Sequence, residues 1–83
     1  VLPDAADYPI WATVMTAAYQ QLCQDVERGM KTVLDSYGTT NPAEFFAVAT
    51  EAFFEKPQQF RHRHPALYTQ LQHYYRLDPL QWV

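Results

Sequence analysis

Apolar residues recur along the first third of the chain at spacings of three and four, a pattern typical of one apolar helix face. The positions that make this face are Trp11, Val14, Met15, Ala18, Tyr19, Leu22 and Val26. Because proline is well accepted at the first helical position, we predict a helix over about 9–28 that begins at Pro9, after Asp7 or Tyr8. Gly29 then marks a frayed or capped end.

A second helix is signalled by its start. Asn41 is a good N-cap, Pro42 suits the first helical position, and Glu44 places an acid in the first turn. We expect this helix over 42–55, ending before Pro57.

The remaining segments have weaker patterns. Residues 31–40 are predicted to form a loop, in which Gly38 can take a positive φ without strain. A short turn over 58–64 is expected to lead into a last helix over about 65–76, ended by the Asp-Pro pair at 78–79. Strand alternation is absent, so the prediction is an all-α fold of three to four helices in a single segment, 1–83.

Composition narrows the class of protein. The chain has 83 residues, 16% aromatic and 18% charged, which favours one small packed core over disorder. A formal charge of -3 gives no support to nucleic-acid binding. No apolar run approaches the roughly 20 residues of a membrane span, and no signal peptide is visible. A single cysteine, Cys23, excludes an internal disulfide and a cysteine-based zinc knuckle, and fits a reducing compartment.

Three acidic residues share one face of the second helix. On a wheel of 100° per residue, Glu44, Glu51 and Glu55 fall within an arc of about 40°. The rest of the helix is largely apolar, so these carboxylates need water, a cation or a hydrogen-bonding partner. Such a stripe is usually a solvated face, and Glu44 also suits a capping box. The pattern by itself leaves both interpretations open.

A long motif adds a resemblance to this pattern. The stretch YGTTNPAEFFAVATEAFF, residues 37–54, resembles the C-terminal signature of the Mlc titration factor A family of glucose-regulated zinc peptidases. It is more distantly similar to the segment that bears the last zinc ligand in the catalytic domain of anthrax lethal factor. The likeness continues through 64–68 to 78–79 and so covers most of the chain. It implies the C-terminal helical part of a zincin-like α+β metallopeptidase.

The resemblance assigns roles to two residues. Glu44 matches the carboxylate that completes a zinc site of two histidines and one glutamate, and Tyr37 matches a tyrosine whose hydroxyl lies near the metal. Zinc held in this way keeps a position for water and lowers its pKa. A neutral phenol can donate a hydrogen bond to the oxyanion of the reaction. Glu51, two turns beyond Glu44, is a candidate acceptor for the outer N–H of a ligand histidine.

The chain departs from a complete peptidase in one respect. It has no His-Glu-x-x-His motif, and one carboxylate cannot make a tetrahedral zinc site. We therefore expect a piece of a longer protein, whose other part supplies that motif. Alone, the chain is expected to be inactive and to hold no zinc tightly.

Partners also follow from the resemblance. It implies a peptide substrate and a cytoplasmic protein that binds the Mlc repressor and so influences glucose uptake, with neither nucleic acid nor membrane bound directly. The alternative hypothesis is a non-catalytic helical interaction module that offers the apolar face of its first helix to another protein.

Other side chains with chemical potential have simpler interpretations. His62 and His64 flank Arg63, and neighbouring arginines disfavour a bound cation, so we expect a solvated turn there. His73 is expected to pack at the surface or half-buried in the last helix. Cys23 is expected to be a buried small apolar residue.

Overall fold

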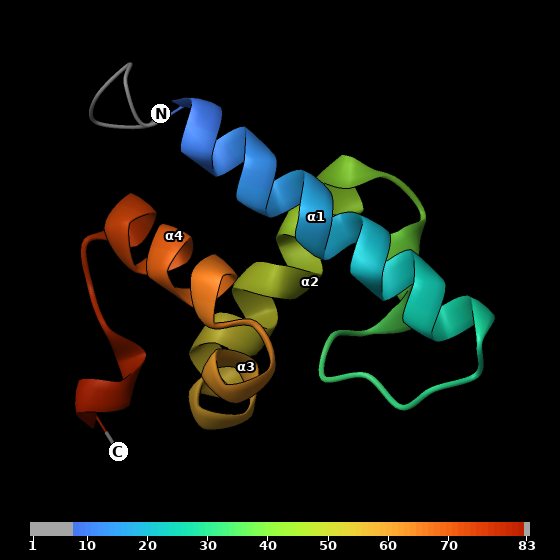
Figure 1. The fold of residues 1–83 in the computed structure, drawn as a ribbon. Coiled ribbons are helices and arrows are strands. Elements are labelled where there is room, and N and C mark those ends of the chain that lie inside the picture. Colours follow the sequence, from blue (N-terminus) through green and yellow to red (C-terminus); the bar gives the residue numbers. More distant parts are fainter. Residues whose placement is uncertain (1–7, 83) are drawn as a thin grey trace.

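The computed structural model describes residues 8–82, a range that contains four α-helices and no strand (Figure 1). The elements in chain order are α1 (Tyr8–Glu27), η2 (Ser36–Thr39), α2 (Pro42–Glu55), α3 (Pro57–Arg63), α4 (Pro65–Tyr75) and η3 (Pro79–Trp82), where η marks a 3-10 turn. The predicted all-α fold is confirmed. Asp7, one of the two residues expected to precede the first helix, lies outside the described residues.

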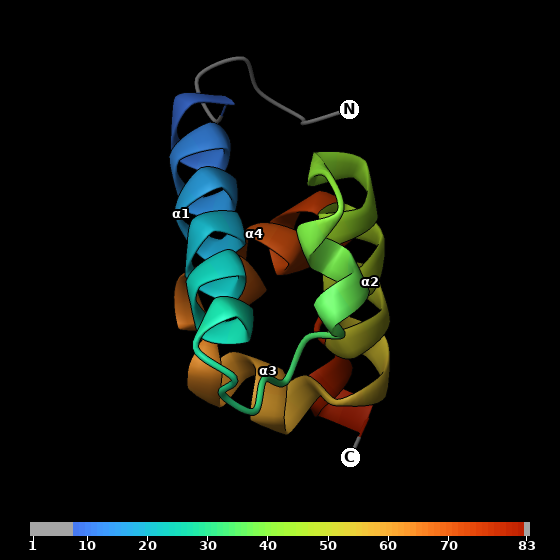
Figure 2. The same ribbon diagram turned by 90° about the vertical axis from the view of Figure 1, so that its right-hand side faces the viewer.

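The helices enclose one core. In Figure 2, α1 and α2 stand on opposite sides of the molecule, α4 crosses between them and α3 closes one end. The core contains ten buried apolar side chains, nine from the four helices and one, Leu34, from the segment before η2: Leu22, Leu34, Phe45, Ala49, Ala52, Phe53, Phe60, Leu67, Tyr68 and Leu71. The apolar face predicted for α1 packs against this core: Leu22 is fully buried and the other side chains of the face are partly buried.

Two of the helix boundaries are single residues that precede a proline. Lys56 ends α2 and precedes α3, and His64 ends α3 and precedes α4. Their φ angles are -134° and -133°, outside the helical region, because the ring of a following proline clashes with a helical residue before it. The chain therefore starts a new helix at each proline after a break of one residue.

The turn predicted over 58–64 is wrong, because α3 fills most of that range. The helix begins at Pro57, and the ring of Phe60 is fully buried in the core. A seven-residue helix with one large apolar side chain shows no apolar periodicity, so the sequence pattern did not reveal it.

The ends of the first and the last predicted helices are set by residues in the left-handed conformation. After α1, Gly29 has a φ of +71°, and its N–H donates to the carbonyl of Val26, so the capping interpretation holds. After α4, Arg76 takes a φ of +57° and acts as the cap rather than as the last helical residue.

One buried ion pair ties α1 to α3. Asp25 is only 4% exposed, and its carboxylate accepts hydrogen bonds from Arg63 at 2.9 Å and from the amide of Gln21 at 2.8 Å. A carboxylate taken out of water needs such partners. The arginine is about half exposed, so the pair is buried mainly on its acidic side.

Replacing this arginine should therefore destabilise the fold. Arg63→Met leaves the buried Asp25 carboxylate without its cation, and we expect the free energy of unfolding to fall by about 1.5–3 kcal/mol, the usual contribution of a hydrogen bond to a charged group. Urea denaturation followed by circular dichroism measures the change. The exposed Arg28→Met is the control and should stay within about 0.5 kcal/mol of the parent. Equal stability of the two variants would contradict a stabilising role for the pair.

Candidate functional site

Glu44 lies in the first turn of α2. The side chain of Asn41 accepts a hydrogen bond from the Glu44 N–H at 2.8 Å, and Pro42 occupies the first helical position, so the predicted helix start is observed. The Glu44 side chain is half-buried, and within residues 8–82 its carboxylate has no hydrogen-bond or ion-pair partner. It does not close a capping box, which leaves its oxygens available to a group outside the described chain.

Tyr37 is carried by η2, a turn fixed at both ends. At one end, the Asp35 carboxylate accepts a hydrogen bond from the Tyr37 N–H at 2.8 Å. At the other end, the hydroxyl of Tyr19 in α1 donates to the carbonyl of Thr39 at 3.1 Å. Partial burial and the neighbouring Cys23 raise the pKa of that Tyr19 hydroxyl. The Tyr37 side chain itself is 58% exposed.

The turn and the helix meet at Gly38, which packs on Val48 of α2. Val48 follows Glu44 by four residues, so the two side chains lie on the same face of the helix. The structure therefore brings η2, which carries Tyr37, against the first half of α2, which carries Glu44. The positive φ suggested for Gly38 is wrong: Gly29 and Arg76 are the residues with positive φ in the described range. Gly38 matters through close packing instead.

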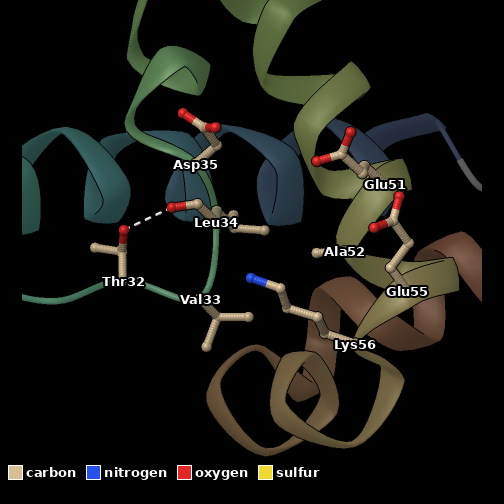
Figure 3. Close-up of a pocket in the computed structure, with 8 residues that line it drawn as sticks. All are labelled: Thr32, Val33, Leu34, Asp35, Glu51, Ala52, Glu55 and Lys56. Carbon is tan, nitrogen blue, oxygen red and sulfur yellow. Dashed lines mark hydrogen bonds between the residues drawn. The ribbon is translucent and has the colours of Figure 1, made fainter.

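Glu51 lies farther along α2, in a different environment from Glu44. It borders a pocket of about 140 Å³ between α2 and the segment before η2 (Figure 3). The pocket is lined by Thr32, Val33, Leu34, Asp35, Glu51, Ala52, Glu55 and Lys56. Figure 3 shows the Lys56 side chain reaching across the pocket toward Leu34, with Asp35 and Glu51 to one side of it. The structure thus groups Glu51 with a lysine and two other acids.

A complete metal site requires several ligand side chains placed close together. Within residues 8–82, no group of three or more histidine, cysteine, aspartate or glutamate side chains is placed to hold a metal ion. A tetrahedral site needs three protein ligands and a water, or four protein ligands. The donor set of the described chain therefore does not fit a zinc ion by itself, and Glu44 offers it one carboxylate.

The two histidines that flank Arg63 lie in α3 and at the joint that follows it. His62 is exposed on α3, and His64 is half-buried at the joint before α4, where its ring lies 5.8 Å from that of Phe60. The solvated turn expected for this pair is thus replaced by a helix and a joint. Burial lowers the pKa of His64, the neighbouring Arg63 lowers it further, and Asp25 partly opposes them.

Sequence reasoning missed the groups that hold η2. An aspartate often accepts a hydrogen bond from the backbone N–H two residues on, so the Asp35–Tyr37 contact had a local signal. The bond from Tyr19 to Thr39 joins residues 20 positions apart and had none. Cys23, expected to be buried, is half-buried.

Similarity to known proteins decides the family. The sequence model of the glucose-regulated metallo-peptidase M90 family matches residues 1–76. The chain belongs to this family. The resemblance noted in the motif from Tyr37 to Phe54 is therefore confirmed at the level of the family.

Relatives of this M90 chain are longer than it is. It is 51% identical over 74 residues to the uncharacterized protein slr2042 of Synechocystis, covering 89% of this chain and 27% of that protein. Mlc titration factor A of Klebsiella pneumoniae is 50% identical over 50 residues, 60% of this chain and 19% of the relative. The protein of the same name from Edwardsiella ictaluri is 36% identical over 73 residues, which cover 86% of this chain and 28% of that relative. The M90 chain thus spans about a quarter of these relatives or less.

Two further findings concern solved structures and membrane spans. No solved structure matches the M90 chain. Within residues 8–82, each helix is too short or too polar to cross a bilayer.

The lowered pKa of His64 predicts a pH dependence of stability. Protonation of His64 is disfavoured in the folded state. When the pH falls below the pKa of about 6.5 that the histidine has in the unfolded chain, the unfolded chain therefore binds more protons than the folded chain. The contribution of neutral His64 to the free energy of unfolding is fully present above pH 6.5 and is lost as the pH falls toward the pKa of His64 in the folded chain. Urea denaturation at pH 7.5 and at lower pH should therefore show a steeper loss for the parent than for His64→Gln. His62→Gln, on the exposed neighbour, should keep the parent slope, and identical slopes in all three would refute the assignment.

Proposed function

We propose that this chain is part of a zinc-dependent peptidase, to which it contributes Glu44 as a metal ligand and Tyr37 as a donor to the oxyanion. The observation that carries the proposal is the unpartnered Glu44 carboxylate in a capped first turn, beside the turn that exposes Tyr37. Membership of a metallopeptidase family supports it. The two histidine ligands and the general base would come from the longer protein that the relatives represent.

The placement of Glu44 suits a ligand. A carboxylate on the first turn of a capped helix has a fixed backbone, because Asn41 and Pro42 define where the helix starts. Aromatic residues that follow Glu44 are held by α1: the ring of Phe45 lies 5.5 Å from Tyr19, and that of Phe46 lies 6.0 Å from Trp11. The helix therefore cannot easily roll, and Glu44 keeps its direction.

Tyr37 suits a hydrogen-bond donor for the same reaction. Its side chain is exposed while its backbone is fixed, so the phenol can reach a bound peptide without loss of a contact inside the chain. The hydroxyl would donate to the carbonyl oxygen of the scissile peptide as negative charge develops there.

Glu51 has a supporting role in the proposal. It lies seven residues after Glu44 on the same face, about 10 Å along the helix axis. A carboxylate at that position would accept a hydrogen bond from the outer N–H of a ligand histidine and fix its tautomer.

The wider role is proposed from the relatives. Several of them are named Mlc titration factor A, and we propose that the complete protein likewise contacts a repressor of the Mlc type in the cytoplasm and takes part in glucose regulation. The alternative, a non-catalytic module built on α1, is not favoured, because the apolar face of α1 packs on the chain's own core.

Removal of the ligand charge tests the role of Glu44. In the complete protein, Glu44→Gln should weaken zinc binding by roughly a hundredfold or more, because loss of a group outside the ligands already costs 10–100-fold. Atomic absorption after dialysis against a chelator measures the zinc content. Glu55→Gln makes the same change on the same helix face and should retain the metal. Full zinc content in Glu44→Gln would exclude this ligand.

Removal of one hydroxyl tests the role of Tyr37. In the complete protein, Tyr37→Phe should lower kcat by about tenfold to a thousandfold, with zinc content and KM little changed, because the lost bond forms mainly in the transition state. Steady-state hydrolysis of a chromogenic peptide measures both constants. Tyr8→Phe removes the hydroxyl of another exposed tyrosine and should keep the parent rate. A parent-like kcat for Tyr37→Phe would take this residue out of the mechanism.

A further inference from the structure

We propose that Gly38 is a positioning residue, which sets the place of the Tyr37 hydroxyl because it has no side chain. The inference rests on the proposed function of Tyr37 and adds what holds that residue in place. It starts from the contact between η2 and the two long helices.

Gly38 is buried where η2 meets both α1 and α2. A Cβ atom built on it would lie 2.5 Å from Cγ2 of Val48 and 3.1 Å from Cδ2 of Leu22. It would also lie 3.6 Å from the backbone Cα of Phe45. The first distance is far inside van der Waals contact, so any side chain at position 38 forces a movement.

The movement falls on the turn rather than on the helices. Valine in a helix holds one side-chain rotamer for about 90% of observations, so Val48 has little freedom to turn away. Leu22 and Phe45 are fully buried in the packed core. The element with room to shift is η2, whose outer side is exposed at Ser36 and Tyr37.

A shifted turn carries Tyr37 with it. The Tyr37 ring is 58% exposed, so the position of its hydroxyl follows from the backbone of η2. That backbone is held by Asp35 before it and by the Tyr19 hydroxyl after it, with Gly38 between them. A displacement of about 1 Å at a reacting group can cost about a hundredfold in rate.

The other glycine provides a matched control. Gly29 has a φ of +71° with no atom within 4 Å of an added Cβ, whereas φ at Gly38 is not positive. Gly29→Ala therefore strains the backbone at the end of α1, outside η2, while Gly38→Ala crowds the turn without backbone strain. The pair separates a general loss of stability from a displaced turn.

Steady-state kinetics in the complete protein test the proposal. Gly38→Ala should lower kcat about a hundredfold, with KM and zinc content close to the parent. Gly29→Ala should keep the parent kcat. The double variant Gly38→Ala/Tyr37→Phe should be no slower than the slower of its two single variants, because both changes remove the same interaction.

A compensating substitution at Val48 gives the most specific test. Val48→Ala deletes the methyl group that an alanine at 38 would strike, so Gly38→Ala/Val48→Ala should regain most of the lost kcat. A parent-like kcat in Gly38→Ala, additive losses with Tyr37→Phe, or no rescue by Val48→Ala would each overturn the inference. If Tyr37→Phe itself hydrolyses at the parent rate, the proposed function fails instead, and the two failures are distinguishable.

A readout without activity uses the 83-residue chain. The Tyr37 N–H donates to the Asp35 carboxylate at the start of η2, and the Thr40 N–H donates to the Tyr37 carbonyl at its end. Hydrogen exchange at both should therefore speed up in Gly38→Ala and slow again with Val48→Ala. If Gly38→Ala does not fold, Tyr19→Phe loosens the same turn by removing one hydroxyl. That variant should show faster exchange at Thr40 and a smaller fall in kcat, and parent values for both would overturn the inference.

Discussion

The arrangement of α2, α3 and α4 depends on the contacts that the buried ring of Phe53 makes. That ring lies on the inner face of α2, 6.4 Å from the ring of Phe60 in α3 and 5.0 Å from that of Tyr68 in α4. Full burial of such a side chain contributes about 1.5–3 kcal/mol, a large share of the free energy of unfolding of so small a domain.

The same contact determines which way α2 faces. Small residues, Ala49 and Ala52, lie on the buried side with Phe53 and allow the neighbouring elements to approach closely. Because the aromatic side is held inward, the acidic side of the helix faces out. The direction in which Glu44 leaves the helix is therefore a consequence of core packing.

Local chemistry made the start of α2 predictable from the sequence. Asn41, Pro42 and Glu44 act through neighbouring backbone groups, and the observed helix has the expected cap. The helix α3 was missed because the contacts that hold it, the buried Phe60 and the pair of Arg63 with Asp25, are made with distant elements. The Asp25–Arg63 pair joins residues 38 positions apart, and spacing along the chain carries no sign of it.

The candidate site was predictable in a different sense. Periodicity put Glu44 on an acidic face but gave no reason to prefer it to Glu55, and only the resemblance of the motif singled it out. The structure then added what a motif cannot contain: a free carboxylate on Glu44 and a fixed turn under Tyr37. The close contact at Gly38 could not be foreseen, because it depends on where Val48 lies in space.

The single-residue joints at Lys56 and His64 also affect how the chain reaches its native state. With one residue between consecutive helices, α2, α3 and α4 need almost no loop closure before they touch. Chains rich in such sequence-local contacts cross a low entropic barrier and fold in microseconds to milliseconds. Contacts between α1 and α4, by contrast, close a much longer loop than those among α2, α3 and α4.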